Sequence, residues 1–304
     1  MKSLKIIFMG TPEFAVPSLK ALVEAGKNVV AVITAPDKPK GRGQKLAFSP
    51  VKEYAVSQEL PVLQPTNLKN PAFLEELRSY EADLQVVVAF RMLPEAVWDM
   101  PKEGTFNLHA SLLPQYRGAA PINWAIINGE KETGATTFML KHEIDTGSVM
   151  YQIKEPIHPE DNVGTVYERL MNNGAQLVVK TVDKIESGQY DLVPQNEDQE
   201  LKHAPKIFKE TCEIDWNKTS EAIHNLVRGL SPYPAAWTHL KDKSLKIYQT
   251  EIIDKALAAG TVDSDGKTYL HYGTADGALS ILDLQLQGKK RMKVTDFLRG
   301  YKFN

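Results

Sequence analysis

The chain has 304 residues, 42% of them hydrophobic and 24% charged, and its formal net charge is −2 at pH 7. This length and composition are typical of a globular protein with two domains, and no apolar run approaches the roughly 20 residues that cross a membrane. A single cysteine, Cys212, excludes an intramolecular disulfide framework and fits a reducing compartment, so we expect a cytoplasmic protein with a structural thiol.

Strand and helix patterns alternate through the first half of the chain. Residues 4–9 form an apolar run that predicts a buried strand, and Pro17 suits the first turn of the helix that follows. This alternation predicts an α/β fold with a doubly wound, mostly parallel sheet. An amphipathic pattern over residues 163–187 predicts one long helix. We expect the remaining strands at 28–35, 83–89, 105–108 and 133–140, and shorter helices at 51–58, 71–80, 94–100 and 119–128.

The pattern changes after the long helix. Residues 189–206 lose all periodicity and are rich in Gln, Asp, Glu and Pro, which is typical of an interdomain linker. Residues 207–304 contain a short helix at 222–230 and then short strands separated by turn sequences, a pattern that predicts a small antiparallel β-barrel of the oligonucleotide-binding kind. We therefore expect one domain in residues 1–188 and a barrel in 207–304. Topology alone fits a structural or dimerisation domain equally well.

Charge is distributed unevenly between the two parts of the chain. Residues 1–200 carry a net charge of −6, whereas residues 201–304 carry +4. Such a difference is a hint of a part that faces nucleic acid, although a mildly basic domain whose lysines only maintain solubility also fits it. The last 16 residues hold a single acidic residue, Asp296, and six basic residues, Lys289, Lys290, Arg291, Lys293, Arg299 and Lys302.

Two polar segments follow predicted strands. The first, residues 106–118, places Asn107 and His109 near the carboxyl end of a strand, where open α/β sheets bind ligands. Both side chains point to the same face, because they are two residues apart on a strand. The second segment, residues 142–147, places Asp145 in a turn that ends in glycine. An amide, an imidazole and a carboxylate together predict an acyl-transfer site that has no nucleophile of its own.

Nucleotide and metal cofactors are not expected. After the first strand, Pro12 and Glu13 occupy the positions at which a dinucleotide-binding loop needs close backbone approach to a pyrophosphate. The seven histidines have no metal-ligand spacing. His142 lies close to Asp145 in sequence, but its place in a turn after a strand predicts a side chain that is either exposed or located behind the residues that contact the substrate.

These segments resemble the formyltransferases that use 10-formyltetrahydrofolate. Asn107, His109 and Asp145 fall on the family's Asn, His and Asp, and the flanking sequences Ser-Leu-Leu-Pro (111–114) and Asp-Thr-Gly (145–147) match its signatures. The similarity extends over essentially the whole chain. The stretches at 8–15, 41–43, 214–216 and 228–234 are similar in particular to members that formylate methionine on initiator tRNA.

The resemblance implies a set of roles. Asn107, His109 and Asp145 would be catalytic, 10-formyltetrahydrofolate would be the formyl donor, and initiator methionyl-tRNA would be the acceptor, with no metal, membrane or protein partner. A long polar loop at 36–49 would close over the acceptor end of the tRNA, and a loop that follows the strand at 83–89 would line the pterin pocket. The substrate-binding residues that the resemblance implies are Arg42, Phe90, Arg91, Leu93, Ser111, Leu112, Leu113 and Pro114.

The chain departs from the family pattern in two places. Gln115 stands where the family usually has Arg, which removes one basic contact. Phe90 and Arg91 stand where the family often has Tyr-Gly, so the resemblance leaves the detailed shape of the pterin pocket and the role of Arg91 open.

The expected chemistry is the attack of a primary amine on the formyl carbon, which creates a tetrahedral oxyanion. Asn107 and His109 are placed to donate hydrogen bonds to that oxygen, and each well-placed donor typically contributes roughly 2.7–4 kcal/mol. Asp145 would orient His109 or steer the water that accepts the proton of the amine. The acceptor amine is itself the nucleophile, so no serine or cysteine nucleophile is required.

Three functions remain in competition at this stage. They are formyl transfer to methionyl-tRNA, formyl transfer to a small amine such as an amino sugar nucleotide or a purine precursor, and RNA binding without catalysis. The basic domain at 201–304 and Arg42 favour the first over the second, because a small acceptor requires neither. The complete set of Asn107, His109 and Asp145 favours both enzymes over the binding protein.

Overall fold

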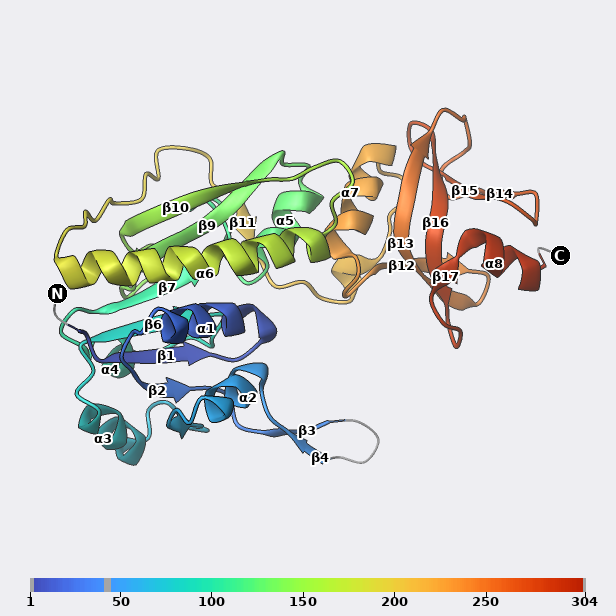
Figure 1. Ribbon diagram of the computed structural model, residues 1–304. Helices are drawn as coiled ribbons and strands as arrows, with labels where there is room; N and C mark the ends of the chain where they lie inside the picture. Colours follow the sequence, from blue (N-terminus) through green and yellow to red (C-terminus); the bar gives the residue numbers. More distant parts are fainter. Residues whose placement is uncertain (1–2, 41–44, 303–304) are drawn as a thin grey trace. The chain divides into compact units, whose positions relative to one another are not determined.

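The computed structural model describes residues 3–40 and 45–302, and these divide into two compact units (Figure 1). Unit 1 comprises Met1–Arg117, Gly134–Glu155 and Tyr167–Lys202. Unit 2 comprises Gly118–Thr133, Pro156–Val166 and His203–Asn304. The chain thus passes between the units several times, and the domain boundaries expected at residues 188 and 206 stay predictions.

Unit 1 is built on a seven-stranded sheet in the order β10-β9-β7-β6-β1-β2-β5. Strands β5, β2, β1, β6 and β7 are parallel, and β9 is antiparallel to β7. The mostly parallel sheet confirms the predicted fold class. Its central strands β1 and β6 are buried at every position and mostly apolar, because both faces of the sheet are covered. The strands are β1 Ile6–Gly10, β2 Val29–Ile33, β5 Val62–Leu63, β6 Leu84–Val88, β7 Thr105–His109, β9 Glu132–Met139 and β10 Val149–Pro156.

Helices cover both faces of this sheet. The residues of β7 alternate between these two faces, so some face one set of helices and the others face the other set. Helices α1 and α6 lie on one face (Figure 1), where Phe14 packs edge-to-face against Tyr167. A Cβ on Gly174 of α6 would lie 2.9 Å from Leu108, so this glycine allows α6 to contact β7 closely. The opposite face carries α3 and α4. The helices are α1 Val16–Glu24, α2 Pro50–Ser57, α3 Pro71–Ser79, α4 Glu95–Trp98 and α6 Val163–Ser187, with the 3-10 turn η1 Glu13–Ala15 before α1.

Most predicted elements of unit 1 are confirmed, with differences that have local causes. The long helix occupies the predicted residues, and α2 and α3 begin at prolines preceded by the capping side chains of Ser49 and Asn70. The helix expected at 94–100 is only one turn long. Strand β10 was not predicted, because its exposed positions include Lys154 and its apolar residues do not form a run. A small hairpin, β3 Lys38–Lys40 and β4 Lys45–Ala47, was also not predicted.

Unit 2 combines helices with a curled antiparallel sheet, which confirms the expected small β-structure. The sheet has the order β12-β13-β16-β15-β14, and β17 pairs with β16. Strand β13 is longer than the short strands expected, and an irregularity between Ile247 and Thr250 allows it to bend. Cys212 is buried, and burial raises the pKa of its thiol. The elements are β12 Ala236–Leu240, β13 Lys243–Ile253, β14 Val262–Ser264, β15 Leu270–Gly273, β16 Ala278–Leu286, β17 Met292–Lys293, α5 Pro121–Ile127, α7 Ser220–Leu230, α8 Val294–Gly300, η2 Glu210–Cys212 and β11 His203–Ala204, which pairs with β8 Arg117–Gly118.

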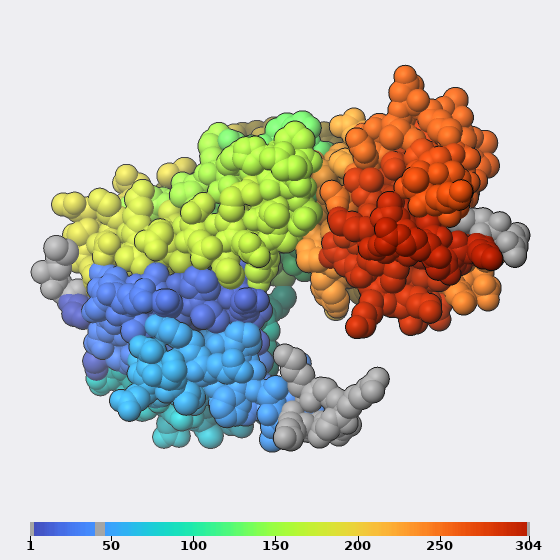
Figure 2. Space-filling view, turned by 45° about the vertical axis from the view of Figure 1, so that its right-hand side comes forward, coloured from blue at the N-terminus to red at the C-terminus, as the bar shows by residue number. Residues whose placement is uncertain are grey.

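Figure 2 shows that the red C-terminal residues of unit 2 form part of its outer surface. This region contains β17 and α8, whereas its sequence predicts only a basic segment. Among the helices that the structure describes, none has the length and apolarity required to cross a membrane.

Candidate active site

The predicted residues Asn107 and His109 lie at the carboxyl edge of the parallel sheet, on the face opposite α6. Leu108 packs against α6, so its two neighbours point the other way, as strand geometry requires. Thr105 on the same face donates a hydrogen bond to the carbonyl of Trp98 in α4, at 2.6 Å. Asn107 is flanked by Val87 of β6 and by a residue of β9. Asn107 and His109 therefore lie together at the carboxyl end of β7, beside the carboxyl end of β6.

His109 is held by one backbone hydrogen bond that fixes the role of each ring nitrogen. Its side chain is only 7% exposed, and Nε2 lies 2.9 Å from the carbonyl oxygen of Tyr116. A carbonyl can only accept, so Nε2 carries the hydrogen and Nδ1 is the atom left for proton exchange. Nδ1 faces Oδ2 of Asp145 at 3.9 Å. This separation is too long for a direct hydrogen bond, and a water or an amine can hydrogen bond to both atoms.

Asn107 offers an amide that the rest of the protein does not use. Its side chain is half-buried, and it makes no hydrogen bond to any other residue that the structure describes. A half-buried amide without a protein partner has its donors available for a ligand. This is the property expected of a group that stabilises an oxyanion.

The turn that carries Asp145 explains why the sequence there is Asp-Thr-Gly. Asp145 has a left-handed backbone, with φ of 54°, which Asp tolerates better than most residues. A Cβ on Gly147 would lie 1.6 Å from the carbonyl oxygen of Met139, so only glycine fits where the turn packs against the end of β9. The side-chain amide of Gln195 donates to the carbonyls of Asp145 and Gly147, both at 2.8 Å. Gln195 carries no signal in the sequence, because it lies in the aperiodic polar segment whose composition predicts a linker.

The segment Ser111–Pro114 forms a tightly bonded turn. Ser111 is fully buried, and its hydroxyl donates to the carbonyl of Gln115 at 2.6 Å. The hydroxyl of Thr136 donates to the Ser111 carbonyl at 2.6 Å and accepts from the backbone of Leu113 at 3.2 Å. These polar groups hold the turn, and the surfaces that remain for a substrate are the partly exposed side chains of Leu112 and Pro114.

Gln115, the departure from the family pattern, has a clear structural partner. Its side-chain nitrogen donates to the Glu200 carbonyl at 3.1 Å, and its oxygen accepts from the backbone of Lys202 at 2.9 Å. The residue therefore binds the segment that follows α6 against the turn at 111–114.

Arg91 also has partners that the sequence did not reveal. Its guanidinium donates to the carbonyls of Thr66, at 3.2 Å, and Pro65. It thereby joins the loops that follow β5 and β6. Phe90 and Leu93 are half-buried against the apolar cluster beneath α3 and α4. Both apolar side chains thus lie beside the carboxyl end of β6, and their role in lining a pterin pocket stays a prediction.

Arg42 lies outside the described residues, and its predicted role stays a prediction. The base of its loop is anchored by Lys52, whose ammonium donates to the carboxylate of Asp37 at 2.6 Å and to the amide oxygen of Gln64 at 2.7 Å. The hydrogen bond from Lys52 holds the pKa of the Asp37 carboxyl below its ordinary value.

Two other features lie apart from these residues. The side chain of His142 is 85% exposed, as expected.

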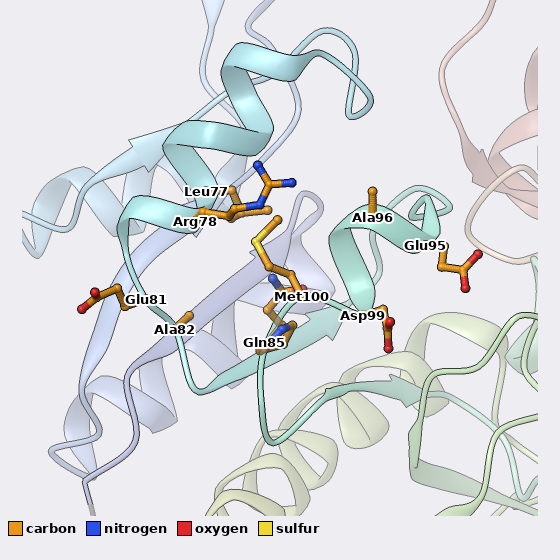
Figure 3. Close-up of a pocket in the computed structure, with 10 residues that line it drawn as sticks. Leu77, Arg78, Glu81, Ala82, Gln85, Glu95, Ala96, Asp99 and Met100 are labelled. Atoms are coloured by element: carbon orange, nitrogen blue, oxygen red, sulfur yellow. The ribbon is translucent and has the colours of Figure 1, made fainter.

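A groove of about 600 Å³ between α3 and α4 includes Gln85, which pairs with Thr105 at the start of β7 (Figure 3). Four residues along a strand span about 13 Å, so Gln85 lies well away from His109 at the strand's other end. Among residues 3–40 and 45–302, no group of three or more His, Cys, Asp or Glu is arranged to hold a metal ion.

Sequence comparisons match nearly the whole chain. The family model described as formyl transferase matches residues 4–182, and the one described as formyl transferase, C-terminal domain, matches residues 206–302. A methionyl-tRNA formyltransferase from Phocaeicola vulgatus is 60% identical over 313 residues, which cover 99% of this chain and 97% of that relative. The corresponding enzymes from Parabacteroides distasonis and Bacteroides fragilis are 59% and 56% identical, with 99% of this chain and 97% and 96% of those relatives covered.

Solved structures share the fold at low sequence identity. An N-formyltransferase from Helicobacter canadensis, in complex with folinic acid and dTDP-3-aminofucose, has a TM-score of 0.70 at 22% identity, with 95% of this chain and all of that chain covered. HypX from Aquifex aeolicus, in complex with tetrahydrofolic acid, has a TM-score of 0.64 at 20% identity. All of this chain is covered in that comparison, but it spans only 49% of the length of HypX.

Proposed function

This chain belongs to the formyl transferase family, and on that premise we propose that it transfers the formyl group of 10-formyltetrahydrofolate to the amino group of methionine on initiator tRNA. The observation that carries the proposal is the uncommitted amide of Asn107 beside the facing pair His109 and Asp145, at the carboxyl edge of the sheet. The near full-length relatives named methionyl-tRNA formyltransferase support this acceptor. The reaction supports translation initiation, and we place it in the cytoplasm.

The three polar residues divide the work of the transfer. The amine nitrogen of methionine forms a bond to the formyl carbon, and the bond between that carbon and the donor nitrogen breaks. Asn107 donates to the oxygen that becomes negatively charged, a contact that strengthens as charge develops. His109 and Asp145 accept a proton from the attacking amine, directly or through one water, and a proton returns to the leaving nitrogen. No covalent intermediate with the protein is required.

The fixed tautomer of His109 gives this scheme a specific proton route. Because Nε2 is bonded to the Tyr116 carbonyl, Nδ1 is the ring atom that accepts the proton. Oδ2 of Asp145 lies 3.9 Å from this atom. The pair thus acts on a group placed between its two members.

The donor fits the loops around this edge of the sheet. Half-buried Phe90 and Leu93 offer an apolar wall for a pterin ring, and Arg91 holds their loop against the loop after β5. Leu112 and Pro114 are partly exposed on the neighbouring turn. We propose these residues as the donor site, within a catalytic part at residues 1–188.

The acceptor is proposed to bind through two basic regions. One is the loop that contains Arg42. The other is the C-terminal part of unit 2, where Arg291 and Lys293 are ion-paired to Asp283. Lys289 and Lys290 are exposed and have no ion pair to another residue within the described part of the chain. These two lysines are therefore the strongest candidates for contacts to phosphate.

Neutralising Lys289 and Lys290 is expected to flatten the salt dependence of tRNA binding. Each lost phosphate contact lowers the slope of log K against log salt concentration by about 0.7–0.9, so the double variant K289Q/K290Q is expected to lose about 1.4–1.8 units. Filter binding or fluorescence anisotropy at several salt concentrations measures the slope. The control variant is K102Q, which changes an exposed lysine just before the amino end of β7 in unit 1. An unchanged slope in the double variant would exclude these lysines from the contact.

The acceptor is tested by direct competition between substrates. The protein is incubated with 10-formyltetrahydrofolate and equal concentrations of methionyl-initiator tRNA and a dTDP-linked amino sugar. We expect N-formylmethionine on the tRNA and no formylated sugar. If the sugar were formylated and the tRNA were not, the protein would be a small-molecule formyltransferase instead. If neither product formed, the assignment as an enzyme would be contradicted.

A further inference from the structure

Gln195 makes four hydrogen bonds that fully satisfy its side-chain amide. Its nitrogen donates to the carbonyl oxygens of Asp145 and Gly147, both at 2.8 Å. Its oxygen accepts from Nε of Arg117 at 3.0 Å and from Nη2 at 2.6 Å. A glutamine amide has two donor hydrogens and two acceptor lone pairs, so every bonding position is used.

Arg117 fixes which way this amide points. A guanidinium can only donate, so the oxygen of Gln195 must face Arg117 and the nitrogen must face the two carbonyls. The Arg117 side chain is 12% exposed and also donates to Glu197 at 2.8 Å. The guanidinium is thus held on two sides, and a rotated amide would place an NH₂ group against it.

The backbone next to Gln195 is also anchored. Val193 and Val149 exchange two backbone hydrogen bonds, at 2.8 and 2.9 Å, which attach the segment after α6 to β10. In Figure 1 this segment leaves the end of α6 and passes along β10. Gln195, two residues later, therefore reaches the Asp145 turn from a fixed point.

We infer that Gln195 is a positioning residue that holds the Asp145 turn in the geometry needed for catalysis. The inference rests on the proposed role of Asp145 in formyl transfer. The turn needs such support, because Asp145 has a left-handed backbone and the neighbouring Ile144 is 61% exposed. Two hydrogen bonds to the carbonyls of Asp145 and Gly147 restrict the rotation of the turn, and this keeps the carboxylate of Asp145 opposite Nδ1 of His109.

The substitution Gln195→Leu is the primary test. It keeps the approximate volume and removes all four hydrogen bonds, and we expect kcat to fall by about 10- to 100-fold, since a displacement near 1 Å can cost two orders of magnitude. The KM values for the donor and for tRNA are expected to change by less than about twofold, because the residue touches neither substrate. Gln199→Leu changes an exposed glutamine in the same segment and is expected to retain wild-type kinetics.

A second variant keeps the test informative if Gln195→Leu folds poorly. Gln195→Glu retains the pair with Arg117 but loses both donors to the carbonyls of Asp145 and Gly147. We expect a loss of kcat similar to that of the leucine variant, because the donors hold the turn. Wild-type kcat in Gln195→Glu would overturn the inference.

A double-mutant cycle separates positioning from general damage to the fold. If Gln195 acts through Asp145, Gln195→Leu is expected to reduce kcat by less than about twofold in an Asp145→Ala background. A full additional loss there would overturn the inference. Near-normal turnover of Asp145→Ala alone would instead contradict the proposed active site. A crippled Asp145→Ala together with a fully active Gln195→Leu would contradict only the positioning role.

Discussion

Replacing Asn107 with alanine is expected to lower kcat for formyl transfer by about 10²–10³-fold, because it removes a preorganised donor to the developing oxyanion. The amide has no partner among the described residues, so its removal leaves no unsatisfied protein group behind. The thermal midpoint is therefore expected to stay close to that of the wild type. Single-turnover measurements with saturating donor isolate the chemical step.

His109→Ala and Asp145→Ala are expected to be comparably severe, because each removes one side of the proton-accepting pair. His142→Ala is the matched control, since this histidine lies near Asp145 in sequence and its side chain is 85% exposed. Near-normal single-turnover rates in any of the Asn107, His109 or Asp145 variants would remove that residue from the mechanism. A loss in His142→Ala as large as that in His109→Ala would show that the readout does not distinguish the site from its surroundings.

Gly147→Ala is expected to have the second large effect on kcat, although Gly147 takes no part in proton transfer and contacts no substrate in the proposed scheme. The added methyl group would lie 1.6 Å from the Met139 carbonyl and 3.2 Å from the ring of Phe138. The end of β9 cannot yield without losing its pairing, so the turn must move and carry Asp145 away from His109. We expect kcat to fall by about 10²-fold, with a loss of stability of roughly 1–3 kcal/mol from overpacking.

The comparison variant is Gly277→Ala in unit 2, where the nearest atom to an added Cβ lies at 3.4 Å. Ordinary van der Waals contact predicts wild-type activity and little change in stability. If Gly147→Ala retained wild-type activity, the Asp145 turn would not need its observed geometry.

The sequence predicted those parts of the fold that depend on local pattern. The apolar runs of β1 and β6 and the amphipathic pattern of α6 appear at the predicted positions, because burial on both faces or on one stripe leaves a direct periodic signal. The position of Asn107 and His109 on the same face of the sheet follows from strand geometry alone. Strand β10 lacked such a signal, because its apolar residues do not form a run and the charged Glu155 is buried within it.

The supporting residues of the site could not be predicted, because they act over long sequence distances. Gln195 contacts a turn 50 residues earlier, and Gln115 binds the backbone of Lys202, 87 residues later. Arg91 similarly reaches carbonyls 25 and 26 residues before it. Polar side chains in aperiodic segments resemble solvated loop residues until the fold brings their partners close. The resemblance to a family predicted Asn107, His109 and Asp145, whereas the structure shows the hydrogen bonds that hold His109 and the Asp145 turn.

The most direct test of the central claim is a single-turnover experiment with formyl-labelled 10-formyltetrahydrofolate and methionyl-initiator tRNA. Wild-type protein in excess is mixed with the charged tRNA, the tRNA is deacylated, and the released amino acid is analysed for N-formylmethionine. We expect stoichiometric labelled N-formylmethionine from the wild type, and a rate reduced by about 10²–10³-fold with Asn107→Ala. Absence of labelled N-formylmethionine with the wild type, or an equal rate with Asn107→Ala, would contradict the account.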